Sequence, residues 1–441
     1  MLKSGQKQKG TNSMRFSDFG EKFTSQAGIT SLMDDLGNAL ATNQSENSKP
    51  LIMMGGGNPA HIEPVQDYFQ NRLKYIANSK QALQQLIGVY DPPQGNIDFI
   101  KAMTDLLNSE FGWGLGPENI GLTNGSQAAF FMLFNLFAGD FSGSQQKQIQ
   151  LPMAPEYIGY SDAGLTVDFF KSTRPTIEML DSHTFKYHID FNKFKVSDNT
   201  GAICVSRPTN PTGNVLTDGE IQQLDKIARK NGVPLIIDGA YGTPFPNLIF
   251  SEAAPMWNEN TILCLSLSKF GLPAARTGIV VADEKVIKAM AGVNAIINLA
   301  TGSFGSILAQ ELVESKEIIK ISKSIIRPYY LNKADKARQL LNELLQGLPY
   351  ALHKIEGAMF IWLWLKDCPV SNQTLYERLK EKGVLIVSGH HFFPGLNSGL
   401  DDSWRHKQEC LRITYSQDDV LVEQGIKIIA KEVHRAYQES K

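Results

Sequence analysis

The chain has 441 residues, of which 42% are hydrophobic and 20% are charged, and its formal net charge is −2. A chain of this length can bury a large core and has room for about two or three domains. Nucleic acids and anionic membranes attract proteins through concentrated positive charge, so this balance argues against both as partners. No stretch reaches the roughly 18 consecutive apolar residues that a membrane helix needs.

The first residues, MLKSGQKQKGTNS, carry lysines but lack the hydrophobic middle of a secretory signal. We therefore expect residues 1–14 to be a disordered lead-in. The four cysteines lie far apart and form no CxxC pair, and Cys204 and Cys264 fall in short apolar runs. This scatter favours buried free thiols over disulfides, and the cytoplasm is the expected compartment.

From Gly121 to Asp283, short apolar runs alternate with helical patterns. The runs predicted as buried strands are Ile149–Leu151, Gly201–Val205, Pro234–Ile237, Thr261–Leu265 and Gly278–Ala282. Between the second and third runs, Thr217 and Glu220 have the spacing of a capping box, and Gly232 can close the helix that follows. Strand, helix and strand in this order predict right-handed crossovers and a largely parallel sheet.

A long helical region follows Gly305 and runs through the 340s. Beyond it, Ala358–Leu365 and Val384–Val387 have the pattern of strands, with a helix over Leu375–Lys382 between them. A last helix is predicted from about Asp418 to Tyr437. The predicted organisation is an N-terminal segment over 15–55 that packs with the small domain, a large domain over 56–320 and a small domain over 321–441.

Lys269 follows the predicted strand Thr261–Leu265. It stands in LCLSLSKFG among small and apolar residues, which disfavour the ammonium form and lower the pKa of the lysine. Such a lysine can form a Schiff base with a carbonyl group. The alternative is a lysine at a strand end that simply reaches solvent.

Three more polar side chains follow neighbouring predicted strands. Asp238 comes directly after Pro234–Ile237, Tyr241 lies three residues further on, and Asn210 stands in the tight turn SRPTNPTGN. The carboxyl ends of parallel strands border the crevice where α/β sheets bind ligands. A carboxylate, an amide and a hydroxyl beside a reactive lysine suit a protonated pyridine ring, the electron sink that amino-group transfer needs. Asp238 could instead only cap the next helix.

A phosphate site is predicted beside these residues. LTNGSQ precedes an apolar helix, so Gly125, Ser126 and Gln127 are expected at a helix N-terminus, whose N–H groups bind anions. Ser266 and Arg276 flank the lysine in the sequence and can supply further donors. A Gly-Ser pair before a helix is by itself usually only an N-cap.

Two residues suit a cofactor ring and an amino-acid substrate. Tyr157, in APEYIGY, offers an aromatic plate for a ring, and a core tyrosine is the alternative. Arg412, in CLRIT, lies in an apolar run where an unpaired guanidinium is costly. The carboxylate of a substrate would pair with this guanidinium. The alternative is a structural salt bridge to an acidic side chain of the protein.

Taken in this order, the residues resemble those of the class I aminotransferases that depend on pyridoxal phosphate and have fold type I. The matching positions are Gly57-Asn58-Pro59, Tyr90 with Gly95, Asn124-Gly125-Ser126, Tyr157, Asn-Pro-Thr-Gly at 210–213, Asp238 with Tyr241, Ser266 with Lys269, Arg276 and Arg412. The resemblance runs from about Phe16 to the C-terminus. It implies an α/β fold with a large domain, whose mostly parallel central sheet is flanked by helices, and a smaller α+β domain.

The resemblance implies pyridoxal 5′-phosphate as the cofactor and a role for each residue. Lys269 would carry the cofactor and move the substrate's Cα proton, and Asp238 would pair with the pyridine nitrogen. Asn210 and Tyr241 would bond the phenolic oxygen, and Tyr157 would stack on the ring. The residues implied to hold the phosphate are Gly125, Ser126, Gln127, Ser266 and Arg276. The chemistry implied includes no metal.

The substrate and the assembly are implied in the same way. Arg412, together with Gly57 and Asn210, would bind the substrate carboxylate. Tyr90 would reach the phosphate of a neighbouring subunit's cofactor, so a homodimer with shared active sites is implied.

Longer segments, among them MGGGNPA and HHFFPGL, are similar to members of the family that transfer the amino group of valine to pyruvate. The implied products are 2-oxoisovalerate and alanine, formed in a ping-pong sequence. Neither substrate has a charged side chain, so an apolar pocket without a second arginine is expected. His390 and His391 fall in a loop near where family members enclose the substrate, and we expect both to be structural.

Two other classes of function stay open. A β-lyase or a decarboxylase would share the lysine, the aspartate and the arginine, because these chemistries differ in which Cα bond stands perpendicular to the ring. A broad-specificity alanine aminotransferase would share them as well. A non-catalytic regulator with an aminotransferase-like domain would usually carry a DNA-binding domain as well. The pI near 6.5 and the lack of room before Gly55 argue against the regulator.

Overall fold

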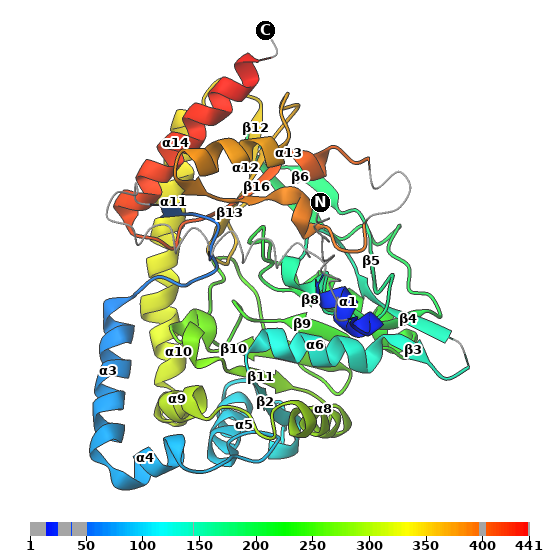
Figure 1. Cartoon of the computed structure of the whole chain (residues 1–441), viewed down its shortest axis with the longest axis vertical. Coiled ribbons are helices and arrows are strands. Elements are labelled where there is room, and N and C mark those ends of the chain that lie inside the picture. Colours follow the sequence, from blue (N-terminus) through cyan, green and yellow to red (C-terminus); the bar gives the residue numbers. More distant parts are fainter. Residues whose placement is uncertain (1–14, 25–36, 38–50, 144, 397–402, 440–441) are drawn as a thin grey trace, which may run out of the picture.

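The computed structural model describes residues 15–24, 37, 51–143, 145–396 and 403–439 (Figure 1). The predicted lead-in over 1–14 and most of the predicted segment over 15–55 lie outside these residues. Among the helices described, none is long and apolar enough to span a bilayer. All four cysteines are buried and free, as the sequence predicted.

An eight-stranded sheet forms the centre of the larger part, in the order β2-β11-β10-β9-β8-β4-β3 with β5 beside β4. Its strands are β2 (Ile120–Thr123), β3 (Gly139–Phe141), β4 (Gln145–Leu151), β5 (Phe170–Ser172), β8 (Thr200–Ser206), β9 (Leu235–Asp238), β10 (Thr261–Ser266) and β11 (Gly278–Val281). The run from β10 to β5 is parallel, as predicted. β11 and β3 are antiparallel to their neighbours, which makes the sheet mixed.

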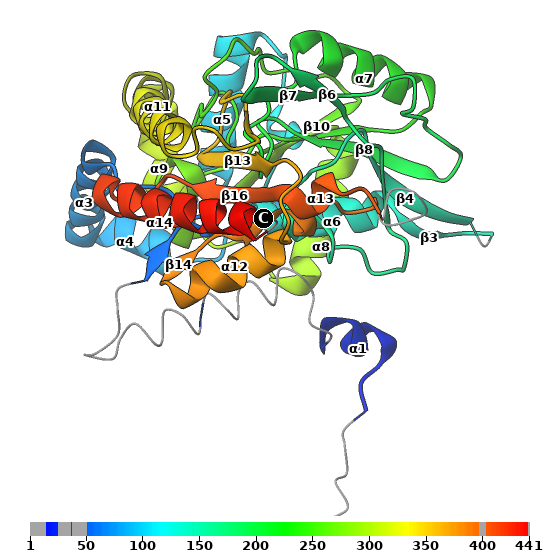
Figure 2. The same ribbon diagram turned by 90° about the horizontal axis from the view of Figure 1, so that it is seen from above.

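Helices cover both faces of this sheet because its central strands are apolar on both sides. Ala202 and Cys204 of β8 pack towards α6 (Ser126–Phe137) and α8 (Glu284–Ile297), while Ile203 and Val205 belong to the core under α5 (Ile97–Phe111), α7 (Asp218–Lys230) and α9 (Phe304–Glu314). Figure 2 shows α6 and α7 on opposite sides of this sheet. The predicted capping box of α7 is present: Thr217 Oγ1 accepts from Glu220 N, and a Glu220 carboxylate oxygen accepts from Thr217 N.

A second, six-stranded sheet has the order β15-β16-β13-β12-β7-β6. Its strands are β6 (Thr176–Met179), β7 (Thr184–His188), β12 (Tyr350–His353), β13 (Phe360–Leu365), β15 (Val387–Ser388) and β16 (Cys410–Thr414). The hairpin of β6 and β7 lies inside the predicted large domain in sequence, yet it extends this C-terminal sheet. The predicted strand Val384–Val387 is divided between β14 (Val384–Leu385) and β15, which belong to different sheets.

β1 (Ile52–Met53) pairs in parallel with β14, so the chain reaches the C-terminal part before it enters the large sheet. The helix α1 (Asp18–Thr24) stands apart from both sheets in Figure 2. The domain boundaries themselves stay a prediction. The remaining helices are α3 (Glu63–Asn78), α4 (Lys80–Ile87), α10 (Glu317–Ile321), α11 (Arg327–Leu344), α12 (Asn372–Glu381), α13 (His406–Glu409) and α14 (Asp419–Gln438).

Candidate active site

The polar residues predicted at strand ends meet at one edge of the large sheet. Asp238 is the last residue of β9, and it lies in register with Ser206 of β8 and Cys264 of β10. Lys269 follows β10 in the short turn Ser268–Phe270. These strands are parallel neighbours, so their carboxyl ends open onto the same crevice.

Lys269 donates a hydrogen bond from Nζ to the carbonyl oxygen of Gly57, 2.6 Å away. Its Nζ also lies 5.4 Å from the centre of the Tyr241 ring. Burial, assisted by the positive charges of Arg412 and Arg276, lowers the pKa of Lys269 to about 8, against the opposing charge of Asp238. The amine is therefore much easier to deprotonate than an ordinary lysine.

Asp238 is buried and bonded at both carboxylate oxygens. Tyr160 Oη donates to Oδ2 at 2.8 Å, and the backbone N of Ala240 donates to Oδ1 at 2.9 Å. Burial raises the pKa of Asp238, while these two donors and Lys269 act in the opposite direction. The hydroxyl of Tyr160 is thus part of the site, although the sequence analysis did not single it out.

Arg412 on β16 connects the C-terminal sheet to the strand-end crevice. Its Nη1 donates to Asn210 Oδ1 at 2.8 Å, and its Nη2 donates to Gly55 O at 2.6 Å. The guanidinium lies against two aromatic rings, 4.4 Å from the centre of Phe360 and 5.1 Å from that of Phe392. Its Nε is buried without a hydrogen-bond partner in the described part of the chain. Among the described residues, the hydrogen-bond partners of Arg412 are an amide and a carbonyl, not the carboxylate that the alternative of a structural salt bridge requires.

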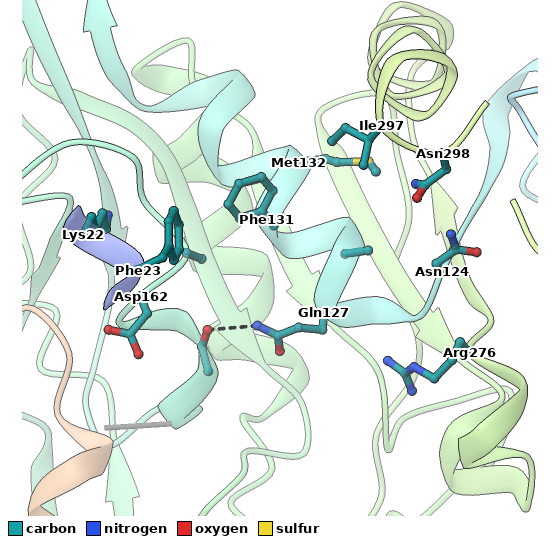
Figure 3. A pocket seen from close by; sticks show the side chains of 13 residues that line it. Lys22, Phe23, Asn124, Gln127, Phe131, Met132, Asp162, Arg276, Ile297 and Asn298 are labelled. Carbon is teal, nitrogen blue, oxygen red and sulfur yellow. Dashed lines mark hydrogen bonds between the residues drawn. The ribbon is translucent and has the colours of Figure 1, made fainter. Parts of the chain in front are cut away.

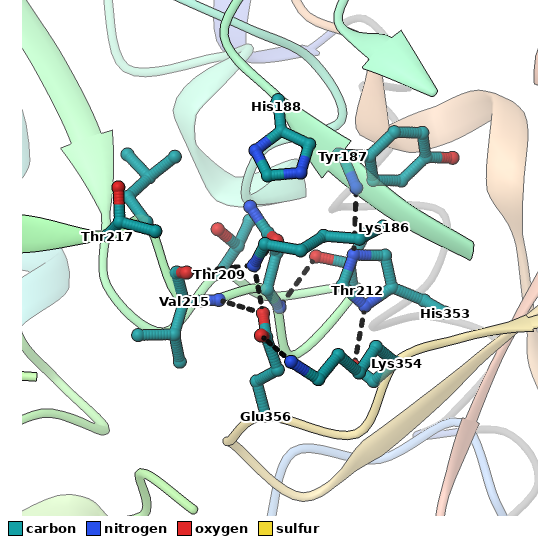
Figure 4. Close-up of polar contacts among 12 residues, drawn as sticks. Lys186, Tyr187, His188, Thr209, Thr212, Val215, Thr217, His353, Lys354 and Glu356 are labelled. Carbon is teal, nitrogen blue, oxygen red and sulfur yellow. Dashed lines mark hydrogen bonds and ion pairs between the residues drawn. The ribbon is translucent and has the colours of Figure 1, made fainter. Parts of the chain in front are cut away.

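The turn that carries Asn210 is anchored by a buried ion pair (Figure 4). Lys186 of β7 contacts the carboxylate of Glu356 and donates to Asn214 Oδ1 at 3.1 Å and to Val215 O at 3.0 Å. Val215 N in turn donates to Glu356 Oε2 at 3.2 Å. β7 and the connection between β12 and β13 therefore hold the turn from outside the crevice.

The predicted phosphate donors gather at the N-terminus of α6. Gly125 has a φ of +90°, and a Cβ there would lie 2.2 Å from Arg276 Nη2, so the guanidinium occupies the space over the glycine. Arg276 Nη1 lies 3.4 Å from Ser268 Oγ, and Ser266 Oγ accepts from Ser268 N at 3.1 Å. A helix N-terminus with an arginine beside it is a physically sound anion site.

A cavity of about 600 Å³ borders this N-terminus (Figure 3). Gln127 and Arg276 line it together with Lys22 and Phe23 of α1. Gln127 is turned away from the helix end, because its Nε2 donates to Gly159 O at 3.0 Å. The side chain of Gln127 is therefore already bonded away from the helix end.

Two tyrosines face the crevice as neutral hydroxyls. Burial raises the pKa of Tyr157 and that of Tyr241, and Arg412 opposes the shift in both. The Tyr157 ring packs so closely that a Cβ at Gly159 would lie 2.4 Å from it. The ring of Tyr241 stands edge-on to Phe360, with the centroids 5.8 Å apart.

Three predicted residues lie outside this group. Tyr90 is 80% exposed, and its hydroxyl forms no hydrogen bond to any residue that the structure describes. His390 Nδ1 lies 2.9 Å from Asn372 Oδ1, and the rings of His390 and His391 are 4.0 Å apart. Burial lowers the pKa of His390 to about 4, so it is neutral near pH 7. The geometry of His390 fits the structural role that we expected.

The residues behind Asp238 were not predicted from the sequence. Tyr160 stands three residues after Tyr157 in APEYIGY, and Glu156 directly precedes Tyr157. Glu156 is buried within the same hydrogen-bonded group. A charged residue in an otherwise apolar and aromatic segment was the signal that could have found it.

Known proteins are similar to nearly the whole chain. The family model of aminotransferases of class I and II matches residues 64–429. The valine–pyruvate aminotransferase of Escherichia coli (strain K12) is 48% identical over 427 residues, which cover 97% of this chain and 100% of that protein.

Two crystal structures agree closely with the fold. One, from Psychrobacter arcticum 273-4, has a TM-score of 0.92 and 46% identity and covers 96% of this chain and 99% of that one. The other, a valine–pyruvate aminotransferase from Salmonella typhimurium LT2, has a TM-score of 0.84 and 47% identity and covers 93% and 100%. The predicted fold class is confirmed, and the chain belongs to the class I and II aminotransferases.

Proposed function

We propose that this aminotransferase transfers the amino group of valine to pyruvate, giving 2-oxoisovalerate and alanine. The relative of known activity that supports this is 48% identical over nearly the full length of both chains. The observation that carries the chemistry is the convergence of Lys269, Asp238 and Arg412 at one crevice, each with a partner that suits its role.

The residues present fit pyridoxal 5′-phosphate as the cofactor. Arg276 over the N-terminus of α6 supplies a positive site for a phosphate, with Gly125, Ser126 and Ser266 beside it. Asp238 offers a buried anion for a pyridinium nitrogen. When bound, the cofactor supplies a carbonyl group for an amine and an electron-withdrawing ring that stabilises negative charge at Cα.

The remaining ring contacts follow from the same placement. Tyr157 would stack on the ring, and Asn210 with Tyr241 would bond its phenolic oxygen. Because burial keeps Tyr241 protonated, its hydroxyl can donate to that oxygen. Gln127 would serve only through its backbone N–H, since its side chain is bonded to Gly159.

Lys269 is suited to hold and release a proton at its Nζ. Its pKa of about 8 lies near the pH of the cell, where a general base works best. Burial, together with the neighbouring guanidinium groups, lowers this pKa. Lys269 would accept the proton from Cα of the substrate and deliver it to C4′ of the cofactor.

Arg412 would bind the carboxylate shared by every amino acid and 2-oxo acid. Arg412 Nε has no hydrogen-bond partner among the described residues, so it can donate to the substrate carboxylate, as can the side-chain N–H groups of Asn210. Gly57 contributes its backbone beside the lysine. Phe360 and Phe392 flank the guanidinium and exclude water from the ion pair. Their rings give the surroundings an apolar character that suits a small aliphatic side chain such as that of valine.

A homodimer with shared sites is part of the proposal, and the cytoplasm is its proposed compartment. Ile296 is 88% exposed, Leu299 is 60% exposed and Tyr90 is 80% exposed. These residues lie in neighbouring segments, because Ser303 Oγ donates to Asp91 Oδ2 and Asn294 Nδ2 donates to Pro93 O. A cluster of large exposed apolar side chains marks a surface for a partner.

The proposal is tested with purified protein loaded with pyridoxal phosphate and offered a panel of amino donors against pyruvate. We expect alanine formation in a one-to-one ratio with 2-oxoisovalerate, and valine among the best donors. Preference for donors other than valine would contradict the specificity. Release of ammonia or carbon dioxide without alanine would instead identify a β-lyase or a decarboxylase.

A further inference from the structure

A buried carboxyl group lies behind Asp238 with no cation beside it. Glu156 is only 1% exposed, and it forms no ion pair with any residue in the described ranges. Ser206 makes two contacts with its carboxyl group: the backbone N donates to Oε1 at 2.9 Å, and Oγ lies 2.5 Å from Oε2. A carboxylate buried in this way is costly, so the neutral acid is favoured.

Glu156 is linked to Asp238 through two hydroxyl groups. Ser206 Oγ lies 3.3 Å from Tyr160 Oη, and Tyr160 Oη donates to Asp238 Oδ2 at 2.8 Å. Ser206 and Asp238 are register partners on β8 and β9, which fixes the distance that the series of hydrogen bonds must bridge. The backbone N of Glu156 donates to Phe392 O at 2.8 Å, so the loop beside Arg412 also helps to position it.

The protonation state of Glu156 decides how the hydroxyl protons point. If Glu156 is neutral, its own O–H donates to Ser206 Oγ, which frees the Ser206 proton for Tyr160 Oη, and Tyr160 then donates to Asp238. If Glu156 is ionised, Ser206 must donate to it and has no proton left for Tyr160. A chain of hydrogen bonds that all point one way is mutually reinforcing.

The surroundings favour the neutral form. The titratable groups that face Glu156 are Asp238, Tyr160 and Cys204, none of which carries positive charge. Burial and the nearby Asp238 raise the pKa of Glu156 to about 8, although the donors from Ser206 and the N–H of Tyr157 oppose the shift.

We propose that Glu156 is a positioning residue, a neutral buried acid whose proton aligns the chain through Ser206 and Tyr160 onto the Asp238 carboxylate. This inference rests on the proposed function, in which Asp238 pairs with the ring nitrogen of the cofactor. Glu156 touches neither cofactor nor substrate in this arrangement. Glu156 acts by keeping the Tyr160 hydroxyl as a strong donor to Asp238, so that the buried carboxylate stays ionised and keeps its orientation.

The first test asks whether Glu156 is neutral, and it needs no cofactor. Infrared difference spectra of the unloaded protein, recorded from about pH 6 to pH 10, compare the wild type with Glu156→Gln. The amide keeps an acceptor for Ser206 N and a donor for Ser206 Oγ but has no titrating proton. We expect a protonated-carboxyl band in the wild type that fades around pH 8 and is missing in the variant. Absence of that band in the wild type at low pH would overturn the proposal.

The second test measures the dissociation constant of pyridoxal phosphate by titrating the unloaded proteins. Glu156→Met removes both polar atoms and should weaken binding about tenfold, whereas Glu156→Gln should stay within about twofold. The ratio of the wild-type constant to that of Glu156→Gln should rise above about pH 8, as the wild-type acid ionises. Lys269 also titrates in this range, but it does so in both proteins and cancels in the ratio.

A double-mutant cycle separates positioning from a merely structural role. Tyr160→Phe and Ser206→Ala each break the chain at another point and should each weaken binding about tenfold. Glu156→Met added to Tyr160→Phe should cost no more than Tyr160→Phe alone, because both act on Asp238 through the same hydroxyl. Additive losses would overturn the proposal. If no variant and no wild-type protein binds pyridoxal phosphate, the proposed function fails, while the infrared test still reports the state of Glu156.

Discussion

Lys269 Nζ donates to the carbonyl oxygen of Gly57, 2.6 Å away, and Arg412 Nη2 makes the equivalent bond to Gly55 O, also at 2.6 Å. One short backbone segment thus binds both of these cationic side chains. A carbonyl oxygen can accept a hydrogen bond from a guanidinium, but a carboxylate binds the guanidinium more strongly, because both groups are charged. Binding of substrate must therefore compete with the Gly55 carbonyl for Arg412.

Gly55→Ala should disturb this segment and Gly56→Ala should not. A Cβ at Gly55 would lie 2.7 Å from Ile386 O, which is backbone and cannot step aside, whereas one at Gly56 meets nothing within 4 Å. We expect kcat/KM for valine to fall about tenfold in Gly55→Ala and to change less than about twofold in Gly56→Ala. Equal activity of the two variants in steady-state assays would show that the segment does not set the geometry of Arg412.

Lys269→Ala should lose the visible absorbance of the bound cofactor and turnover together, because the lysine both attaches the cofactor and moves the proton. We expect kcat to fall by at least about 10³-fold, because a proton-transfer group usually contributes this much and the attachment of the cofactor is lost as well. Lys226→Ala changes an exposed lysine on α7 and serves as the matched control. Ordinary turnover in Lys269→Ala would remove Lys269 from the mechanism.

The pH dependence of cofactor uptake should follow the amine of Lys269. Only the neutral amine attacks a carbonyl, and burial has lowered the pKa of Lys269 from 10.5 to about 8. The uptake rate should rise about tenfold per pH unit below pH 8 and level off above it. Arg412→Met removes a repelling charge, so it should raise the pKa of Lys269 and move the midpoint to higher pH; Arg229→Met, on the exposed face of α7, should leave the midpoint unchanged. Stopped-flow absorbance of the unloaded protein measures this, and a rate that kept rising past pH 10 would contradict the shift.

The central part of the site could be predicted from sequence because its residues follow short apolar runs. Asp238 ends the buried strand β9 and Lys269 lies in the turn that follows β10, and the carboxyl ends of parallel strands lie at the same edge of a sheet. Arg412 was predicted from the cost of burying an unpaired guanidinium, and the structure places its partners Asn210 and Gly55 from 202 and 357 residues away. No local pattern specifies partners at such separations.

Other features could not be predicted for identifiable reasons. β6 has only four residues and is mostly exposed, so the alternation in TIEM is too short to say which sheet the strand joins. β1 has only two residues, too few for any periodicity. In APEYIGY, the two tyrosines look alike in sequence, and the short turn Ile158–Tyr160 decides that Tyr160 and not Tyr157 bonds Asp238.

Breaking the Lys186–Glu356 pair should destabilise the protein strongly. Both side chains are buried, so Lys186→Met leaves the Glu356 carboxylate with only Val215 N and the partly exposed Lys354 as partners and should cost about 3 kcal/mol. Lys186→Met combined with Glu356→Gln should recover much of this, because the amide still accepts from Val215 N without carrying charge. The exposed pair of Lys427 and Glu423 is the control, and Lys427→Met should cost less than about 1 kcal/mol.

Urea unfolding measures these stabilities, and valine kinetics reports on the site. Since Lys186 holds the turn of Asn210 rather than touching substrate, Lys186→Met should raise KM more than it lowers kcat. A loss of stability no larger than that of Lys427→Met would mean that the buried pair contributes little to the fold.

Shared sites predict that a mixed dimer of two impaired variants contains one intact active site. Lys269→Ala lacks the reactive amine, and Tyr90→Phe lacks the exposed hydroxyl that would reach a neighbour's phosphate. In a mixed dimer of the two, one site carries both changes and the other site carries neither. Random association makes about half of the dimers mixed, so about a quarter of all sites should be native.

The two chains are co-expressed with different tags, and the mixed dimer is isolated by sequential affinity steps. We expect its kcat to be about half that of the wild type per dimer, well above that of either parent. Ile296→Asp should lower the yield of dimer in light scattering, since it places a charge on the exposed apolar surface beside Tyr90. If the mixed dimer shows only the mean activity of its two parents, Tyr90 serves its own subunit or none, and the sites are not shared.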